Sequence, residues 1–333
     1  MSAPISKKVN RRQLMAGAAT IGAAVSIPVA AAETVVAVPL KGKSILITGT
    51  SSGFGYLGAL HYARLGGKVI ASMRNLPRPE ATELSEIAKK ENLDLHIIEL
   101  DVLSDESVSK GVAEAEKIAG GALDVVVNNA GIGMSGPIEV QDIEATKLVF
   151  DTNVFGVQRV TLAALPAMRA KKRGQIFNIS SQLGRVMVPG FAQYSPSKFA
   201  LEAMSEQLAY ELVPHGIDVT IIQPGGYPTD IWKKRNIYDK ALLARSDKAI
   251  LDAYPALSSR MGNAQGGGRS ADPMDIPNDI AEIIAMPAGA RPLRRPVHPG
   301  PKPQIAINKV SAETQVGFLG NSPFGPWIKA VHS

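Results

Sequence analysis

Residues 44–55 have the sequence SILITGTSSGFG, in which a short apolar run passes into a turn rich in glycine and serine. The apolar run at 44–48 predicts a strand buried on both faces, and residues 54–65 continue with a helical pattern. Glycines at such a junction let backbone N–H groups and the helix N-terminus approach a pyrophosphate. An ordinary strand-to-helix turn is the alternative. We expect a dinucleotide-binding turn with contacts from Gly49, Ser51, Ser52, Gly53, Phe54 and Gly55.

The rest of the chain continues this alternation of short β-branched runs with longer amphipathic segments. Such alternation is the signature of βαβ units and a parallel sheet. We therefore predict an α/β fold, a single Rossmann-type doubly wound parallel sheet with helices on both faces, within residues 40–300. The predicted strands are 44–48, 68–73, 94–100, 123–128, 175–180 and 218–223. The predicted helices are 54–65, 79–91, 104–119, 141–170 and 191–213.

Composition indicates a soluble globular protein, since 45% of the 333 residues are hydrophobic and 20% are charged. The net charge of +6 is concentrated at the chain ends, and residues 33–289 carry 26 basic and 29 acidic side chains. A nearly neutral body lacks the basic footprint of a nucleic-acid-binding protein. No cysteine is present, and the five histidines show no metal-ligand spacing. We expect neither a nucleic-acid partner nor a metal.

The N-terminus has the order of an export signal. Lys7, Lys8, Arg11 and Arg12 precede a run of uncharged residues that ends in small residues at Ala32. This segment resembles a twin-arginine signal peptide, which implies cleavage of residues 1–32 and a periplasmic or exported protein. The uncharged run is weakly hydrophobic, so we expect no stable membrane span after cleavage. A cytoplasmic protein and one anchored in the membrane by an uncleaved signal are the alternatives.

Two segments depart from the alternating pattern. Residues 227–275 follow a predicted strand end, where open α/β sheets bind ligands, so we interpret them as an insertion that covers a substrate. This insertion contains a glycine-rich run at 263–268 that predicts a flexible loop. Residues 301–333 form a C-terminal tail rich in proline and glycine.

Two further motifs lie beyond the glycine turn. The sequence Asn128-Asn129-Ala130-Gly131 follows the fourth predicted strand, and Tyr194 and Lys198 are four residues apart near the start of a predicted helix. Residues one helical turn apart face the same way. A free tyrosine has a pKa of about 10, and a neighbouring ammonium group lowers it by favouring the phenolate. Each motif by itself is weak evidence for a functional site. A surface tyrosine and lysine often share this spacing, and Asn128–Gly131 alone would be interpreted as a turn.

Together, in this order and spacing, the three motifs resemble the short-chain dehydrogenase/reductase family over residues 40–300. The resemblance implies an NAD(P)-dependent oxidoreductase that interconverts a small-molecule alcohol and a carbonyl compound by hydride transfer. It implies that Tyr194 is the general acid/base and that Lys198 lowers the tyrosine pKa and holds the nicotinamide ribose. It also implies that Ser181 hydrogen-bonds the substrate oxygen, that Asn153 supports a proton relay, and that the protein is a homo-oligomer, a dimer or tetramer.

The resemblance also assigns cofactor contacts at the other strand ends. They are Asp101, Val102, Asn128, Ala130, Gly131, Pro224, Gly225 and Thr229. Asp101 could instead cap the helix that starts near Ser104. Arg74 follows the second strand with no acid beside it, which favours the extra phosphate of NADP over NAD, although an arginine directed to solvent is possible.

The substrate is less defined by the sequence. Trp232, Tyr227, Tyr238 and the basic cluster Lys233-Lys234-Arg235 could line a site for a hydrophobic or anionic molecule, although a basic run on a helix is more often solvated. A non-catalytic dinucleotide-binding sensor or scaffold of the same fold is the alternative function. The presence of Tyr194, Lys198, Ser181 and Asn153 argues against it, because a binding module needs no acid/base group.

Overall fold

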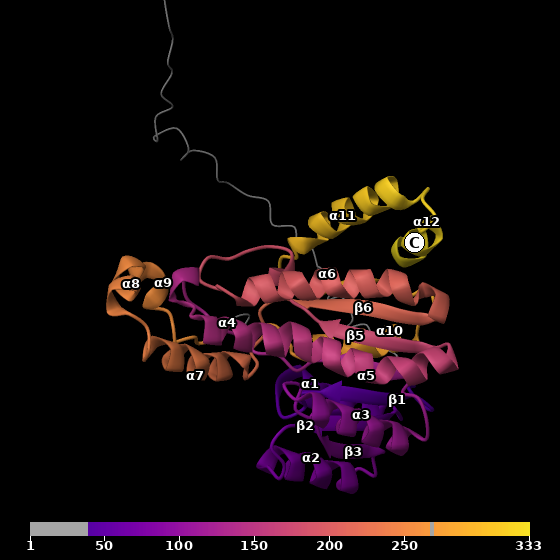
Figure 1. Cartoon of the computed structure of the whole chain (residues 1–333). Helices are drawn as coiled ribbons and strands as arrows, with labels where there is room; N and C mark the ends of the chain where they lie inside the picture. The colour runs from indigo at the N-terminus through magenta and orange to yellow at the C-terminus, as the bar shows by residue number, and fades with distance from the viewer. Residues whose placement is uncertain (1–38, 267–269) are drawn as a thin grey trace, which may run out of the picture. The chain divides into compact units, whose positions relative to one another are not determined.

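The computed structural model describes residues 39–266 and 270–333. Its centre is a parallel sheet with the strand order β3-β2-β1-β4-β5-β6-β7 (Figure 1). The strands are β1 (Ser44–Thr48), β2 (Lys68–Met73), β3 (Leu95–Glu99), β4 (Val125–Asn128), β5 (Gly174–Ile179), β6 (Ile217–Pro224) and β7 (Arg294–Val297). The order reverses between β1 and β4, which is the switch point of a doubly wound sheet. The predicted Rossmann-type α/β fold is therefore confirmed.

Helices cover both faces of the sheet. The longer ones before the insertion are α1 (Gly53–Arg64), α2 (Pro79–Lys90), α3 (Asp105–Ala119), α4 (Ile143–Phe150), α5 (Gly156–Lys171) and α6 (Tyr194–Leu212). Short helical turns are η1 (Ile138–Val140), η2 (Asp151–Phe155), η3 (Gln182–Gly184) and η4 (Val213–His215). The remaining helices are α7 (Ile231–Leu243), α8 (Lys248–Ala253), α9 (Pro255–Ser258), α10 (Asp275–Ala285), α11 (Gln304–Leu319) and α12 (Gly325–His332).

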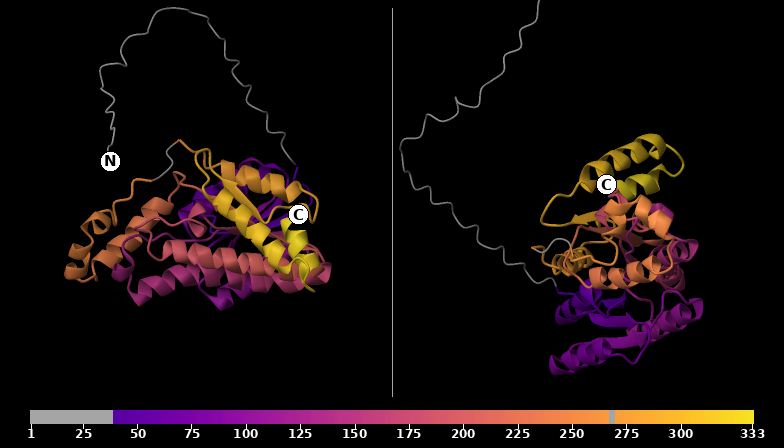
Figure 2. Two further views of the ribbon diagram at one scale, coloured as in Figure 1. Left: turned by 90° about the horizontal axis from the view of Figure 1, so that it is seen from above. Right: turned by 90° about the vertical axis from the view of Figure 1, so that its left-hand side faces the viewer.

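Alternate residues of each central strand enter two different hydrophobic cores. Ile45 and Ile47 of β1 pack with apolar residues of α1, α2 and α10, whereas Leu46 packs with α3, α5 and α6. Successive side chains of a strand point to opposite faces. This is why the central strands read as continuous apolar runs, and why the three helices of each set lie on their own face of the sheet (Figure 2).

The structure differs from the predicted elements in three places. The predicted helix at 141–170 consists of α4, the π-helical turn η2 and α5. The edge strand β7 was not predicted, because it contains two arginines and a proline and pairs on one side only. Such residues are typical of sheet edges. Residues 227–266 carry α7, α8 and α9, while the predicted signal peptide and residues 267–269 lie outside the described residues.

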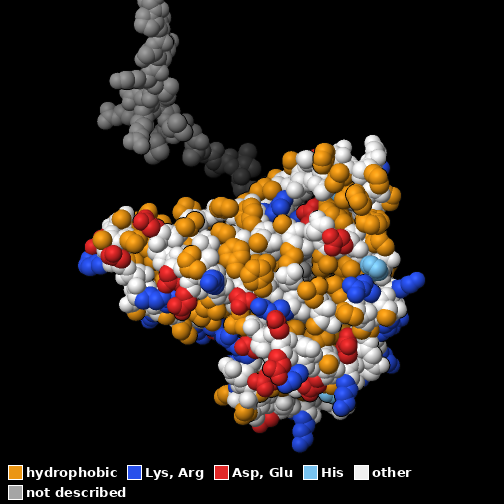
Figure 3. All heavy atoms as spheres, in the orientation of Figure 1, with side chains coloured by type: hydrophobic (Ala, Val, Ile, Leu, Met, Phe, Trp, Pro, Cys, Tyr) orange, Lys and Arg blue, Asp and Glu red, His pale blue; other side chains and the backbone are white. Residues whose placement is uncertain are grey.

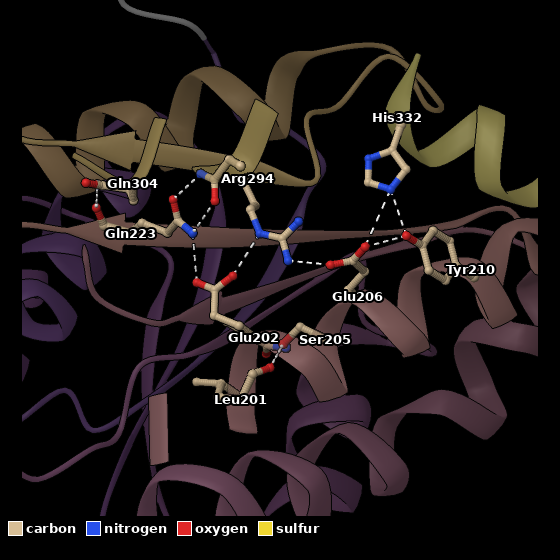
Figure 4. A network of polar contacts seen from close by, with 11 residues as sticks. Leu201, Glu202, Ser205, Glu206, Tyr210, Gln223, Arg294, Gln304 and His332 are labelled. Carbon is tan, nitrogen blue, oxygen red and sulfur yellow. Dashed lines mark hydrogen bonds and ion pairs between the residues drawn. The ribbon is translucent and has the colours of Figure 1, made fainter. Parts of the chain in front are cut away.

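The proline- and glycine-rich tail contains two helices. Gln304 at the start of α11 is fully buried and donates to the main-chain oxygen of Gln223 at 3.4 Å. His332 at the end of α12 contacts the Tyr210 hydroxyl of α6, with 2.7 Å between Nε2 and Oη (Figure 4). Hydrophobic side chains gather on the surface over these helices (Figure 3), and exposed ones include Ile305, Val310 and Phe318. Within residues 39–266 and 270–333, no helix has the length and apolar character needed to cross a membrane.

Candidate active site

A cavity of about 450 Å³ opens beyond the carboxyl ends of the central strands. Its wall includes the turn after β1, the first residues after β2, β4 and β5, and the segment after β6. Ligands bind at this position in open α/β sheets. Among the predicted site residues, the wall contains Gly49, Ser51, Ser52, Gly53, Phe54, Arg74, Asp101, Val102, Ala130, Gly131, Ser181, Tyr194, Lys198, Pro224, Gly225 and Thr229.

The glycine-rich turn is joined to the loop after β4 by hydrogen bonds. The Thr48 hydroxyl accepts from the backbone N–H groups of Asn129 and Ala130, each at 3.0 Å. Asn129 Nδ2 donates to the main-chain oxygens of Thr48 at 2.9 Å and Gly49 at 3.1 Å. A Cβ atom on Gly55 would lie 2.4 Å from that Nδ2, so only glycine fits there. The turn is thus held in one conformation by Asn129.

Asn128 and Gly55, both predicted to contact cofactor, do not line the cavity. The Asn128 side chain is buried and donates to Thr161 Oγ1 at 3.1 Å and to Asn178 Oδ1 at 2.9 Å. These bonds connect β4 with α5 and β5. Asn128 and Gly55 therefore support the glycine-rich turn and the loop after β4 without lining the cavity. The neighbouring Asn129 is the residue that contacts the turn.

Tyr194 begins α6, and Lys198 follows it on the same side of the helix. Lys198 Nζ lies 5.8 Å from the centroid of the Tyr194 ring and donates to the main-chain oxygen of Ile179 at 2.8 Å. Burial lowers the pKa of Lys198 to about 8, while the charge of Glu202 acts in the opposite direction. The ammonium group is therefore placed at the cavity wall by the end of β5.

Ser181 and Arg235 are the groups that act on the Tyr194 hydroxyl. Burial raises the pKa of the Tyr194 phenol, while hydrogen bonding by Ser181 and the charge of Arg235 lower it. Ser181 precedes the turn η3, where its hydroxyl oxygen accepts from the Leu183 N–H at 3.1 Å. Arg235, to which the sequence gave no such role, is therefore a cation whose charge acts on the phenol.

Asn153 lies in the π-helical turn η2 and is fully buried behind the cavity. Its Oδ1 accepts from the Ile132 N–H at 2.9 Å, and its Nδ2 donates to the Ile132 oxygen at 3.0 Å and to Ser197 Oγ at 3.1 Å. A Cβ on Gly131 would lie 3.2 Å from Asn153 Oδ1 and 3.7 Å from Lys198 Nζ. Gly131 therefore leaves open the space between these two polar groups. Single π-helical turns often occur at functional sites.

Three cations, Arg74, Arg78 and Lys234, line the cavity together with the serines of the glycine-rich turn. Lys234 Nζ donates to Ser52 Oγ at 2.7 Å, and Arg78 donates to the main-chain oxygen of Arg74 at 3.3 Å. The pKa of Lys234 is lowered, first by partial burial and then by the charges of Arg78 and Arg74, which oppose those of Asp230 and Glu80. Arg78 and Lys234 were not predicted to bind cofactor, although both line the cavity.

For Asp101 the sequence left open a cofactor contact and a cap of the helix that starts near Ser104. Its Oδ1 accepts from the Leu103 N–H at 3.1 Å, so the side chain closes the turn before α3. The cap of α3 itself is Ser104, whose hydroxyl accepts from the Ser107 N–H at 3.2 Å. Asp101 nevertheless lines the cavity together with Val102. Among the described residues, no group of three or more His, Asp or Glu side chains could hold a metal ion.

Residues 43–239 match the protein family described as short chain dehydrogenase. The chain belongs to the short chain dehydrogenase family. Its relatives include an uncharacterized oxidoreductase of Bacillus subtilis, 37% identical over 78% of this chain and 90% of the relative. Retinol dehydrogenase 8 of Bos taurus is 34% identical over 80% of this chain and 84% of the relative. A solved short-chain dehydrogenase structure from Streptomyces avermitilis covers 83% of this chain and 96% of its own, with a TM-score of 0.66 and 27% identity.

This short chain dehydrogenase has polar contacts that sequence reasoning did not identify. Asn129 was quoted within its motif but given no role, and Lys234 and Arg235 were noted only as members of a basic cluster. The signal available was the position of both basic residues in the segment that follows the sixth predicted strand, where a ligand is expected. Their individual directions depend on α7, which places Lys234 at Ser52 and Arg235 near Tyr194.

Proposed function

We propose that this protein is an NADP-dependent oxidoreductase that interconverts an alcohol and a carbonyl compound, with Tyr194 as general acid/base. The observation that carries the proposal is one cavity whose wall holds both the glycine-rich turn and the Tyr194, Lys198 and Ser181 side chains. Membership of an oxidoreductase family supports the reaction class. A sensor or scaffold would have no use for an acid/base group such as Tyr194 on the wall of the binding cavity.

The residues around the turn after β1 fit a dinucleotide. Gly49 has a φ of +72°, and a Cβ atom there would lie 2.9 Å from Ala130 Cα, so the backbone itself forms the cavity surface. Ser51 and Ser52 supply hydroxyl groups, and Gly53 begins α1. Backbone N–H groups at a helix N-terminus favour a pyrophosphate. When bound, the nicotinamide would donate or accept the hydride.

The side chains of the protein would bind the substrate and move a proton. In carbonyl reduction, Ser181 and Tyr194 donate hydrogen bonds to the substrate oxygen, and the Tyr194 hydroxyl releases its proton to that oxygen. In alcohol oxidation the phenolate accepts the proton from the hydroxyl group. Lys198 is placed to bind the nicotinamide ribose. Asn153 would hold the loop at Ile132 against α6 and support the proton relay.

The cations on the cavity wall support NADP over NAD. A 2′-phosphate needs positive charge and hydrogen-bond donors, and Arg74, Arg78 and Lys234 supply both on the cavity wall. Glu80 neutralises part of this charge, because Arg78 forms an ion pair with it at 2.8 Å. Arg74 and Lys234 form no ion pair with an acid among the described residues, and we assign them the main contact with the phosphate.

The test is a substrate screen with Tyr194→Phe as the decisive variant. The wild-type protein is expected to oxidise NADPH with aldehydes or ketones, measured by absorbance of the reduced nicotinamide. Tyr194→Phe should lower kcat by 10²–10⁴-fold, the usual contribution of general acid/base catalysis. Tyr254→Phe is the matched control, because Tyr254 only donates to the exposed Glu139 at 2.6 Å. A Tyr194→Phe variant with more than about a tenth of the wild-type kcat would refute the assignment.

A further inference from the structure

Helix α7 places a buried cation in the part of the cavity next to Tyr194. Arg235 is 8% exposed and lines the cavity. Its guanidinium carbon lies 5.4 Å from the centroid of the Phe191 ring and 4.9 Å from that of Trp232. The Phe191 and Tyr194 ring centroids are 6.3 Å apart, so the guanidinium group and the phenol ring are both neighbours of Phe191. Aromatic faces attract a cation, which holds Arg235 in this position.

The charge of Arg235 is incompletely paired by the protein. The carboxylate nearest to it is that of Asp239, with 3.6 Å between Arg235 Nε and Asp239 Oδ2. Both Asp239 oxygens already accept hydrogen bonds, Oδ1 from the Ser135 N–H at 2.8 Å and Oδ2 from the Ser135 hydroxyl and from the Gly262 N–H at 3.2 Å. Within residues 39–266 and 270–333, Arg235 Nε has no hydrogen-bond partner. A buried charged group without such partners costs free energy, which a bound anion would offset.

Apolar side chains also contribute to the wall of this cavity. They include Ile132, Leu183, Val188, Phe191, Ile231 and Trp232, of which Phe191 and Trp232 contact the guanidinium group. An anion bound by Arg235 would therefore carry an apolar body that contacts these side chains. The guanidinium fork donates two parallel hydrogen bonds, an arrangement that matches a carboxylate.

We propose that the substrate is an oxo acid, or the corresponding hydroxy acid, whose carboxylate binds to Arg235 while its reacting oxygen lies at Ser181 and Tyr194. This inference rests on the proposed function, because it assigns the substrate class of the same site. It makes Arg235 a specificity-determining residue.

The experiment compares acids with their methyl esters, which differ in charge and little in shape. The pairs are 4-carboxybenzaldehyde and its methyl ester, and aliphatic oxo acids of increasing length with their methyl esters. Binding is measured by calorimetric titration into the protein saturated with NADP⁺, where no turnover occurs, and kcat and KM are measured with NADPH. We expect the acid of at least one pair to bind at least tenfold more tightly than its ester.

Substitutions at Arg235 test whether this residue causes the tighter binding of the acid. Arg235→Gln is expected to weaken binding of the acid and raise its KM by about 10- to 100-fold, because a hydrogen bond to a charged group is lost. Binding of the ester should change less than about twofold. Arg235→Lys, which keeps the charge, should retain part of the preference. Lys233→Gln is the matched control, since Lys233 lies on the same helix with its side chain 84% exposed and paired with Asp230.

Three outcomes would overturn the inference while leaving the proposed function intact. One is equal binding of acid and ester, or no binding of any acid, by a protein that reduces neutral carbonyl compounds. Another is an Arg235→Gln variant that binds the acid as the wild type does. The third is an equal fall in kcat for acid and ester in that variant, which would mean that Arg235 acts on Tyr194 alone. The proposed function fails separately, when no carbonyl compound causes oxidation of NADPH or NADH.

Discussion

Arg294 of the edge strand β7 donates through Nε to Glu202 Oε2 of α6 at 2.8 Å (Figure 4). Both side chains are almost fully buried, with 6% and 1% of their surface exposed. Glu202 also accepts from Gln223 Nε2 at 2.9 Å, and its charge raises the pKa of Lys198 one turn earlier on α6. The ion pair therefore links the edge of the sheet to the helix that carries Tyr194 and Lys198.

Arg294→Ala should destabilise the protein by about 3–5 kcal/mol, because it leaves the buried Glu202 without its cation. The free energy of unfolding, measured by urea denaturation at pH 7, checks this value. Arg295→Ala on the same strand is the matched control. Its ion pairs with Asp279 and Glu282 involve more exposed side chains, so we expect a loss of about 1 kcal/mol or less. Equal losses in the two variants would contradict the assigned importance of the buried pair.

The carboxyl group of Glu206 is expected to make the stability of the fold depend on pH. Burial by itself raises the pKa of the Glu206 carboxyl, but His332, Arg294 and Tyr210 together lower it well below its usual range. A folded-state pKa below the unfolded value of about 4.3 stabilises the fold above that pH, and the contribution is lost as pH falls toward the folded-state pKa. Glu206→Gln should therefore flatten the decline of stability below about pH 5. Thermal melts from pH 3 to 7 would show this, and an unchanged slope would refute it.

The sequence predicted six of the seven strands, β1 to β6, because each is a short apolar run with side chains in both cores. It did not predict β7, whose sequence RRPV has one buried apolar residue. Pairing with β6 and the ion pair between Arg294 and Glu202 hold this strand in the sheet. The ion pair joins residues 92 positions apart, and the strand pairing also joins distant segments, so no local pattern contains these contacts.

The same distinction applies to the candidate site. Tyr194 and Lys198 were recognised by their spacing along one helix, which is a local relationship. The sequence could not distinguish the roles of neighbouring residues of the same type. Asn128 points into the interior, while Asn129 binds the glycine-rich turn. Lys233 pairs with Asp230 at the surface, whereas Lys234 reaches Ser52. Which of these two lysines points into the cavity is set by how α7 packs, and the sequence does not show that packing.

Lys234→Ala should weaken use of NADPH more than use of NADH. The substitution removes a cation beside Ser52 that we assign to the 2′-phosphate, so kcat/KM with NADPH should fall roughly tenfold or more while that with NADH changes little. Lys233→Ala provides the control at the adjacent position. Steady-state kinetics with both cofactors decides the point. An equal fall for both cofactors in Lys234→Ala would assign Lys234 to the shared part of the dinucleotide instead.

Gly55→Ala tests the junction between the glycine-rich turn and the loop after β4. The added methyl group would lie 2.4 Å from Asn129 Nδ2 and 2.6 Å from the main-chain oxygen of Gly49, so one of these groups has to move. Overpacking of this kind costs about 1–3 kcal/mol, and displacement of the Gly49 backbone should also weaken NADPH binding measured by fluorescence titration.

Gly317→Ala on α11 is the matched substitution, since no atom lies within 4 Å of the added methyl group. Alanine has the higher helix propensity, by up to about 1 kcal/mol, so this variant should be as stable as the wild type or slightly more stable, with unchanged NADPH affinity. If Gly55→Ala loses stability but binds NADPH as tightly as the wild type does, then the backbone of Gly49 does not contact the dinucleotide. In that case the contact would have to come from Ser51, Ser52 and the N-terminus of α1.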